Sequence, residues 1–233
     1  MDVENKLEVL EQVYQIYDSF ASNMDVACKK YCSDCCTKNV TMTSLEGYGI
    51  LDNIISNGKQ YVLKKLDAAS DSKRFVPKIT TNRLAFICAK GDEPPVEDID
   101  PLWGTCPFLQ DDICHIYEAR PFGCRCFTSK YKCSEKGYAE IDSFVVEVNS
   151  LFLQYIEHID SKGYFGNLTD IVRYIIVNKN NETGDEAKKK ELKKKILENH
   201  PITVFLISHE HKKKIKHVLD ALNSIKVPAS CKK

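Results

Sequence analysis

The residues of this chain best suited to chemistry are its eleven cysteines, most of which fall into two compact groups about 70 residues apart. The first group has the pattern CKKYCSDCC and consists of Cys28, Cys32, Cys35 and Cys36. On a helix these positions stand at i, i+4, i+7 and i+8, so the four thiols would project from roughly one third of the circumference. Because Cys35 and Cys36 differ by about 100° in direction, they could divide between two ions or bracket one cluster.

The second group consists of Cys106, Cys114, Cys124, Cys126 and Cys133. The pair Asp111-Asp112 predicts a turn that folds Cys106 back towards Cys114, as in the knuckles of thiolate metal sites. The segment around Cys124 is expected to be a helix or a helix-like turn. Cys126 would then point away from Cys124 if the segment is helical, and lie alongside Cys124 if the segment is extended.

So many neighbouring thiols indicate metal ligation. Soft sulphur ligands select Zn²⁺, Cu(I) or iron–sulphur clusters over hard cations. A set of four cysteines suits either zinc or a cluster, and such a filled site carries a charge of about −2. The cations Lys29, Lys30, Arg120 and Arg125 stand beside the cysteines and are placed to offset this charge or to donate hydrogen bonds to sulphur.

The N-terminus is acidic and polar, with no basic region leading into a short apolar stretch, so no secretory signal is predicted. No apolar run approaches the ~20 residues that a membrane-spanning helix requires. We therefore expect a cytoplasmic protein with no membrane partner. In that compartment thiols stay reduced, so a disulfide framework is not expected to account for the cysteines.

The cysteine strings resemble those of the YkgJ or CxxCxxCC family, a group of small cysteine-cluster proteins described as zinc- or iron-chelating. The similar pieces are the Cys35-Cys36 pair with its upstream cysteines, Cys106-Pro-Phe-Leu, Cys114-His-Ile-Tyr and Arg120-Pro-Phe-Gly-Cys124-Arg. They cover residues 28–133. More distantly, the chain is similar to flagellin lysine N-methylase, which the resemblance associates with an iron–sulphur cluster and S-adenosylmethionine.

The sequence departs from the family pattern in two places. Its first gap holds three residues where the family name has two, and the string Cys124-Arg-Cys126 adds a cysteine. The eighth ligand is therefore open between Cys126 and Cys133, and we favour Cys133 because Cys126 directly follows Arg125. The predicted metal ligands are Cys28, Cys32, Cys35, Cys36, Cys106, Cys114, Cys124 and Cys133.

Three functions are consistent with this pattern. The first is a metal-binding protein that holds zinc or an iron–sulphur cluster, such as a 4Fe–4S cluster, through cysteine thiolates and has no catalysis of its own. The second is an enzyme like the lysine methylase, which would use an iron–sulphur cluster and S-adenosylmethionine. The third is metal storage or delivery. Neither a phosphate-binding loop nor a hydrolase motif is present in the sequence, so whether the chain is an enzyme stays open.

The elements that position these cysteines are predicted to be mostly helical, an α+β arrangement with a minor strand component. The apolar periodicity indicates helices over 5–20, 44–56, 59–69, 140–160, 167–178, 185–199 and 209–225. The short apolar run RLAFIC at 83–88 favours a strand, and the prolines of 92–101 favour a loop. We expect a cysteine-cluster domain over 1–139 and a helical part over 140–233, which either joins the same domain or covers it.

Other residues are expected to be structural. Cys88 lies within RLAFIC and is predicted to be in the core, and Cys231 to be a free thiol in a polar tail. His115 is the one histidine inside the cysteine groups. Trp103 and Phe108 are expected to pack around the sulphurs, where an apolar layer controls the access of solvent.

The charges are unevenly spread although the formal net charge is zero. Residues 181–233 carry 13 Lys against 7 Asp and Glu. A solvated helix face is the simplest reading of these lysines, and an acidic protein partner is the alternative. No aromatic residues alternate with them as base stacking would require, so nucleic acid is not favoured.

Overall fold

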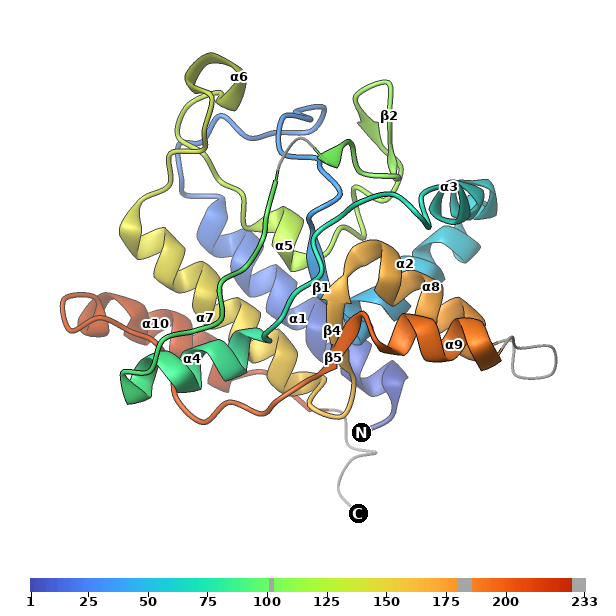
Figure 1. The fold of residues 1–233 in the computed structure, drawn as a ribbon. Helices are drawn as coiled ribbons and strands as arrows, with labels where there is room; N and C mark the ends of the chain where they lie inside the picture. The colour runs from blue at the N-terminus through green and yellow to red at the C-terminus, as the bar shows by residue number, and fades with distance from the viewer. Residues whose placement is uncertain (101–102, 180–185, 228–233) are drawn as a thin grey trace.

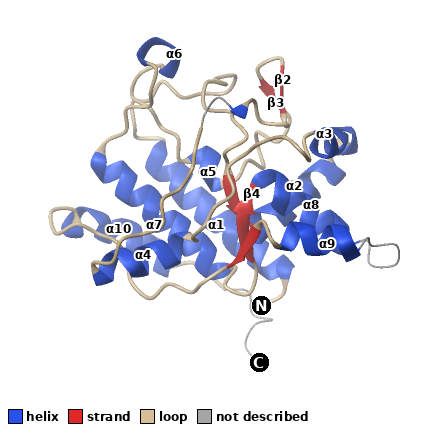
Figure 2. Cartoon of the chain, viewed as in Figure 1, coloured by secondary structure: helices blue, strands red, loops and turns tan. Residues whose placement is uncertain are grey.

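The computed structural model describes residues 1–100, 103–179 and 186–227, and within these it is mostly helical with a small antiparallel sheet, as predicted (Figures 1 and 2). Cys231 lies outside these residues. The helical elements are α1 Val3–Ala21, α2 Ser44–Ser56, the 3-10 turn η1 Gln60–Val62, α3 Leu63–Ala68, α4 Thr81–Lys90, α5 Phe122–Arg125, α6 Cys133–Lys136, α7 Ser143–Ile159, α8 Leu168–Lys179, α9 Glu186–Lys193 and α10 Lys212–Asn223. The strands are β1 Thr41–Thr43, β2 Leu109–Gln110, β3 Ile113–Cys114, β4 Tyr164–Asn167 and β5 Ile196–Glu198.

Helix α1 packs against α7 and α10 through the apolar stripe that the sequence predicts. Asp2 caps the helix, because its carboxylate accepts a hydrogen bond from the backbone N–H of Asn5 at 2.9 Å. The ring of Tyr17 then lies 5.1 Å from Phe152 of α7 and 4.7 Å from Phe122 of α5, both nearly perpendicular to it. This core therefore reaches from the first helix to the segment that carries Cys124.

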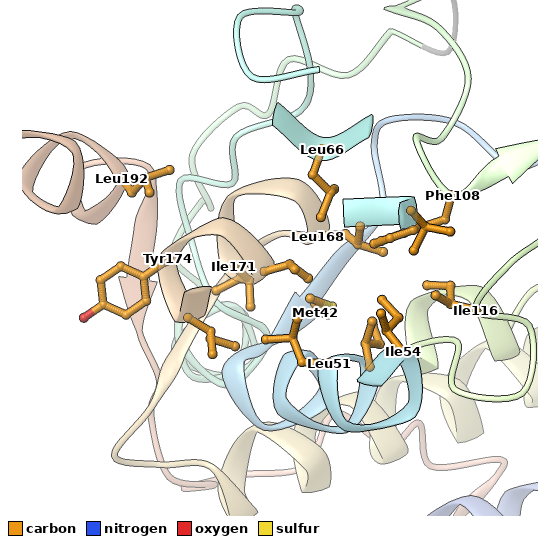
Figure 3. Packing of buried hydrophobic residues seen from close by; sticks show 14 of the residues in the cluster. Met42, Leu51, Ile54, Leu66, Phe108, Ile116, Leu168, Ile171, Tyr174 and Leu192 are labelled. Atoms are coloured by element: carbon orange, nitrogen blue, oxygen red, sulfur yellow. The ribbon is translucent and has the colours of Figure 1, made fainter. Parts of the chain in front are cut away.

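A second core lies between α2, α8 and the sheet (Figure 3). Helix α2 begins with a capping box, in which Thr43 and Glu46 each bond the other's backbone N–H. The N-cap of α2 is thus Thr43, the residue before the predicted start of the helix. The core includes Phe108 and Ile116, which come from the cysteine-bearing loops and pack beside Ile54.

The three-stranded sheet has the order β1-β4-β5, with both neighbouring pairs antiparallel. The segment between the first cysteine group and α2 contains strand β1, in which Thr41 pairs with Asn167. Beyond it, β2 and β3 form a separate hairpin. Residues on both sides of position 139 contribute to each of the two cores.

The segment 83–88 is helical, so its prediction as a strand is wrong. It forms the middle of α4, which Thr80 caps by accepting a hydrogen bond from Arg83 N–H at 3.3 Å. Gly91 ends the helix with a φ of 80°, a left-handed conformation that glycine adopts easily. A short apolar run fits either structure, and here the capping residues decided the outcome. Cys88 is exposed on this helix, so its predicted place in the core is also wrong.

No helix in the described ranges combines the length and apolar character needed to cross a membrane.

Candidate metal centre

The loops that carry the cysteines gather at one end of the molecule, beside α6 and β2 and away from the N-terminus (Figure 1). The first group is not helical there, so the predicted helical spacing of its thiols is wrong. Residues 28–36 form turns, in which Cys32 N–H bonds Lys29 O at 3.0 Å and Cys36 N–H bonds Ser33 O at 2.9 Å. Tyr31 adopts a φ of 75°, which reverses the chain direction.

Backbone pairing joins the two cysteine groups directly. Cys106 N–H donates to Cys36 O at 2.9 Å, and Lys38 N–H donates to Gly104 O at 2.9 Å. Between them, Thr37 and Thr105 form an antiparallel bridge. Residues 70 positions apart therefore lie side by side, with Cys36 next to Cys106.

The hairpin β2-β3 forms the turn that the sequence predicts. Asp111 and Asp112 occupy its two central positions with φ of 49° and 58°, the left-handed values that a tight hairpin turn needs. The hairpin pairs Leu109 with Cys114. Ser33 Oγ donates to Asp112 Oδ1 at 2.6 Å, which ties the first cysteine loop to the hairpin.

The segment after α5 closes the opposite side of the first loop. Ala27 N–H donates to Ser129 O at 2.8 Å, and Ser129 N–H points at Cys28 Sγ at 3.2 Å. Further along, Ser134 N–H donates to Asp34 Oδ2 at 3.1 Å, where α6 begins. These contacts hold Cys133 against the first cysteine group.

Glu46 is the residue that fixes α5, and sequence reasoning did not identify it. Glu46 is 4% exposed, and its carboxylate accepts hydrogen bonds from Phe122 N–H at 2.7 Å, Thr43 N–H at 2.8 Å and Tyr14 O–H at 2.9 Å. The spacing Thr43-x-x-Glu46 is a signal for the cap, but nothing in it indicates the bond to Phe122. Through that bond, Glu46 connects two core helices to the turn that carries Cys124.

Gly123 allows α5 to approach the sheet closely. A Cβ atom at this position would lie 2.9 Å from the carbonyl oxygen of Thr41, closer than side-chain carbons normally pack. The glycine in the string Arg-Pro-Phe-Gly-Cys-Arg is therefore required by packing between α5 and β1.

A cavity of about 280 Å³ opens between these segments. The cysteines that line it are Cys28, Cys32, Cys35, Cys36, Cys106, Cys114 and Cys124, seven of the eight predicted ligands. The other walls are apolar, from residues such as Val40, Ile116 and Leu168, and cationic, from the four predicted lysines and arginines. The tertiary structure thus brings thiols from separate segments around one space.

The two candidates for the eighth ligand occupy different surroundings. Burial is the main cause of the raised pKa values of Cys28 and Cys32, and Cys133 is close enough to both thiols for its charge to add to the effect. Cys126 packs into the core around α1 and α7, and its Sγ lies 3.6 Å from Gly123 O. Burial raises the pKa of Cys126 to about 12. Cys133 belongs beside the first group, whereas Cys126 is held in the core.

Burial and mutual repulsion raise the pKa values of the cavity thiols Cys106 and Cys124. Burial raises the pKa of Cys106 to about 11, and burial together with the charges of Cys106 and Cys114 raises that of Cys124 well above the ordinary value. Backbone N–H groups oppose this effect, from Phe108 on Cys106 and from Ile116 on Cys114. Such amides favour the thiolate.

The cations beside the cysteines are themselves anchored. Arg120 stacks on the ring of Tyr117 at 4.0 Å, and its charge lowers the pKa of Cys114 against the larger opposing effect of burial. Arg125 donates from Nε to Arg120 O at 3.0 Å and from Nη2 to Glu118 O at 2.8 Å. Lys30 pairs with Glu118 at 3.1 Å on the exposed side. Arg125 therefore organises the loop backbone, while Arg120 acts on a thiol.

The remaining predicted neighbours differ in their placement. Phe108 is fully buried and packs in the core beside Cys106 and Cys114. Trp103 instead stacks with the ammonium of Lys73 at 4.6 Å. His115 turns towards η1, with its Nδ1 3.3 Å from the hydroxyl of Tyr61.

Within the three described ranges, no group of three or more His, Cys, Asp or Glu side chains is arranged so that it could hold a metal ion as the side chains now stand. Comparisons of the chain with protein-family models, with curated proteins and with solved structures found no match.

Proposed function

We propose that this chain binds metal through the cysteine centre, as zinc or as an iron–sulphur cluster. The observation that supports the proposal most is the single cavity lined by seven cysteines that come from four stretches of chain. Burial of inert thiols does not account for this clustering, because such a thiol packs equally well wherever a small apolar side chain fits. A set of thiolate ligands of this kind selects soft metals.

The raised pKa values are consistent with this role. Thiols that are buried next to one another stay protonated in the absence of a cation, because each thiolate would repel the others. A bound metal displaces the protons and supplies the missing positive charge. The amides that point at Cys28, Cys106 and Cys114 then stabilise the thiolates further.

Anaerobic purification followed by elemental analysis and a visible spectrum tests the proposal. We expect stoichiometric zinc, or else iron and sulphide with an absorption band near ~400 nm that dithionite bleaches, since Cys-ligated clusters are redox-active chromophores. The variant Cys114→Ser should lose metal. Cys88→Ser is the matched control, because Cys88 is exposed on α4 and outside the cavity.

Two results would overturn the proposal. One is wild-type protein that carries neither metal and takes up neither after reduction. The other is an equal metal content in the wild type, Cys88→Ser and Cys114→Ser.

A further inference from the structure

The eight predicted ligands lie in two layers of the centre. The inner layer adjoins the core: Cys106 and Cys114 pack against it beside Phe108 and Ile116. Cys124 lies in α5, which Glu46 and the close approach of Gly123 to β1 hold in place. Every one of these three thiols is carried by a segment that the core or the hairpin fixes.

The outer layer is carried by exposed loops. Cys32 is exposed, and the neighbouring Tyr31 is 65% exposed. Cys28 is held by the amide of Ser129, and Cys133 by the bond of Ser134 N–H to Asp34. The charges of Cys35 and Cys133 act on both Cys28 and Cys32, as expected for four neighbouring thiols.

The Cys35-Cys36 pair forms the junction between the layers. The backbone bond from Cys106 N–H to Cys36 O, 2.9 Å long, places Cys36 beside the inner thiols. The thiol of Cys35 contacts that of Cys36, and its charge acts on Cys28 and Cys32 in the outer loop and also on Cys124 in the inner layer. Adjacent residues in an irregular loop direct their side chains differently, so each can serve a different layer.

We infer that the eight cysteines form two metal sites and not one. The inner site consists of Cys106, Cys114, Cys124 and one thiol of the Cys35-Cys36 pair, and the outer site of Cys28, Cys32, Cys133 and the other thiol of that pair. The inference rests on the proposed function and adds to it a difference in metal exchange between the two sites. The inner site retains its metal, whereas the outer site exchanges metal with solvent or with an acceptor.

The difference in exchange follows from what must move to release the ion. The outer thiols sit on loops with few buried side chains, and such segments open locally at low cost in free energy. The inner thiols can separate only if the hairpin or α5 leaves the hydrophobic core. A chelator therefore reaches the outer metal first.

Zinc reconstitution of the reduced full-length protein tests this division. Zn²⁺ is the probe, and a chromogenic chelator measures both the amount bound and the rate of release. The wild type should bind two zinc ions per chain and release one in a fast phase and one in a slow phase. The double variant Cys32→Ser/Cys133→Ser should bind one ion and lack the fast phase, and Cys88→Ser should match the wild type.

The results separate the two proposals. A single zinc ion in the wild type, or loss of all zinc in Cys32→Ser/Cys133→Ser with its helical circular dichroism intact, means one shared site and overturns the division while metal binding stands. No zinc in the wild type overturns both. The complementary variant Cys106→Ser/Cys114→Ser should retain only the fast phase of zinc release. If this variant fails to fold, the zinc content and release kinetics of Cys32→Ser/Cys133→Ser are sufficient to test the division.

Discussion

The helical body and the cysteine-bearing loops of this protein are built on different physical principles. In the body, capped helices bury apolar stripes in two cores, and the hydrophobic effect accounts for its order. The loops over 22–40 and 103–142 contain only a short hairpin and helices of single turns. They are held by backbone bonds across the chain and by a small number of side chains.

The comparison shows that the loops have too little apolar burial to fix the thiols by themselves. Phe108, Ile116 and Phe122 anchor them to the body, but the cysteines themselves remain only partly buried. A metal bound at the centre would complete the order of the loops, because its binding free energy is then also folding free energy. The body would be stable without it.

Removal of the proposed metal should produce the largest effect and confine it to the loops. Structural zinc contributes about 10–16 kcal/mol in small metal-dependent domains, so we expect residues 22–40 and 103–142 to lose hydrogen-exchange protection. The amides of α1, α7 and α8 should stay protected, because their cores are apolar. Uniform protection throughout the chain after chelation would contradict this separation.

The substitution Phe152→Ala should affect the body most. Phe152 is fully buried and stacks on Phe122 with ring centroids 5.5 Å apart, so its loss should reduce the free energy of unfolding by roughly 3–5 kcal/mol. Urea denaturation followed by circular dichroism measures this. Metal content at low temperature should be unchanged, and a variant that folds fully yet binds no metal would show that the two regions are not separable.

Glu46→Ala should affect both regions together. It leaves the amides of Thr43 and Phe122 and the hydroxyl of Tyr14 without their acceptor, at roughly 1–3 kcal/mol for a buried unsatisfied group. Because the Phe122 bond fixes α5, metal affinity should also fall. Tyr14→Phe is the control: it removes one bond of the carboxylate but leaves the bond to Phe122. An equal loss of metal in both variants would argue against Glu46 as the positioning residue.

A smaller effect concerns the pH dependence of the body. Burial raises the pKa of Glu157, whose carboxylate accepts hydrogen bonds from Asn82 N–H and His200 N–H, both at 2.7 Å. The folded state therefore binds the proton more tightly than the unfolded chain does. The contribution of this tighter proton binding at Glu157 to stability is full below the ordinary pKa of 4.5. It is lost as the pH rises through the raised pKa.

Glu157→Gln should remove that component. We expect the unfolding free energy of the wild type to fall relative to that of the variant as the pH rises from about 4 to 7. A difference that is constant with pH, or that has the opposite slope, would contradict the raised pKa. Metal content should not respond, since Glu157 contacts α4 and the segment before Pro201 but no cysteine.

Much of the body could be predicted from the sequence because its helices carry their own signals. The predicted structure formed at three such signals: helices at the apolar stripes of 5–20 and 140–160, and a hairpin turn at the aspartate pair before Cys114. The predictions failed at 28–36 and 83–88, where local signals conflict, and at the end of 185–199, where β5 replaces the predicted helix. Four cysteines at helical spacing occupy turns, and a six-residue apolar run between a capping threonine and a glycine forms a helix.

By itself, the sequence determined the number of thiols, their grouping, the cations beside them and the mostly helical fold class, because composition and periodicity are local properties. Only the tertiary structure decided which thiols meet. The pairing of Cys36 with Cys106, the bond from Phe122 to Glu46 and the contact of Ser129 with Cys28 join residues 70 or more positions apart. Such contacts depend on how separate elements pack, and no spacing along the chain encodes them.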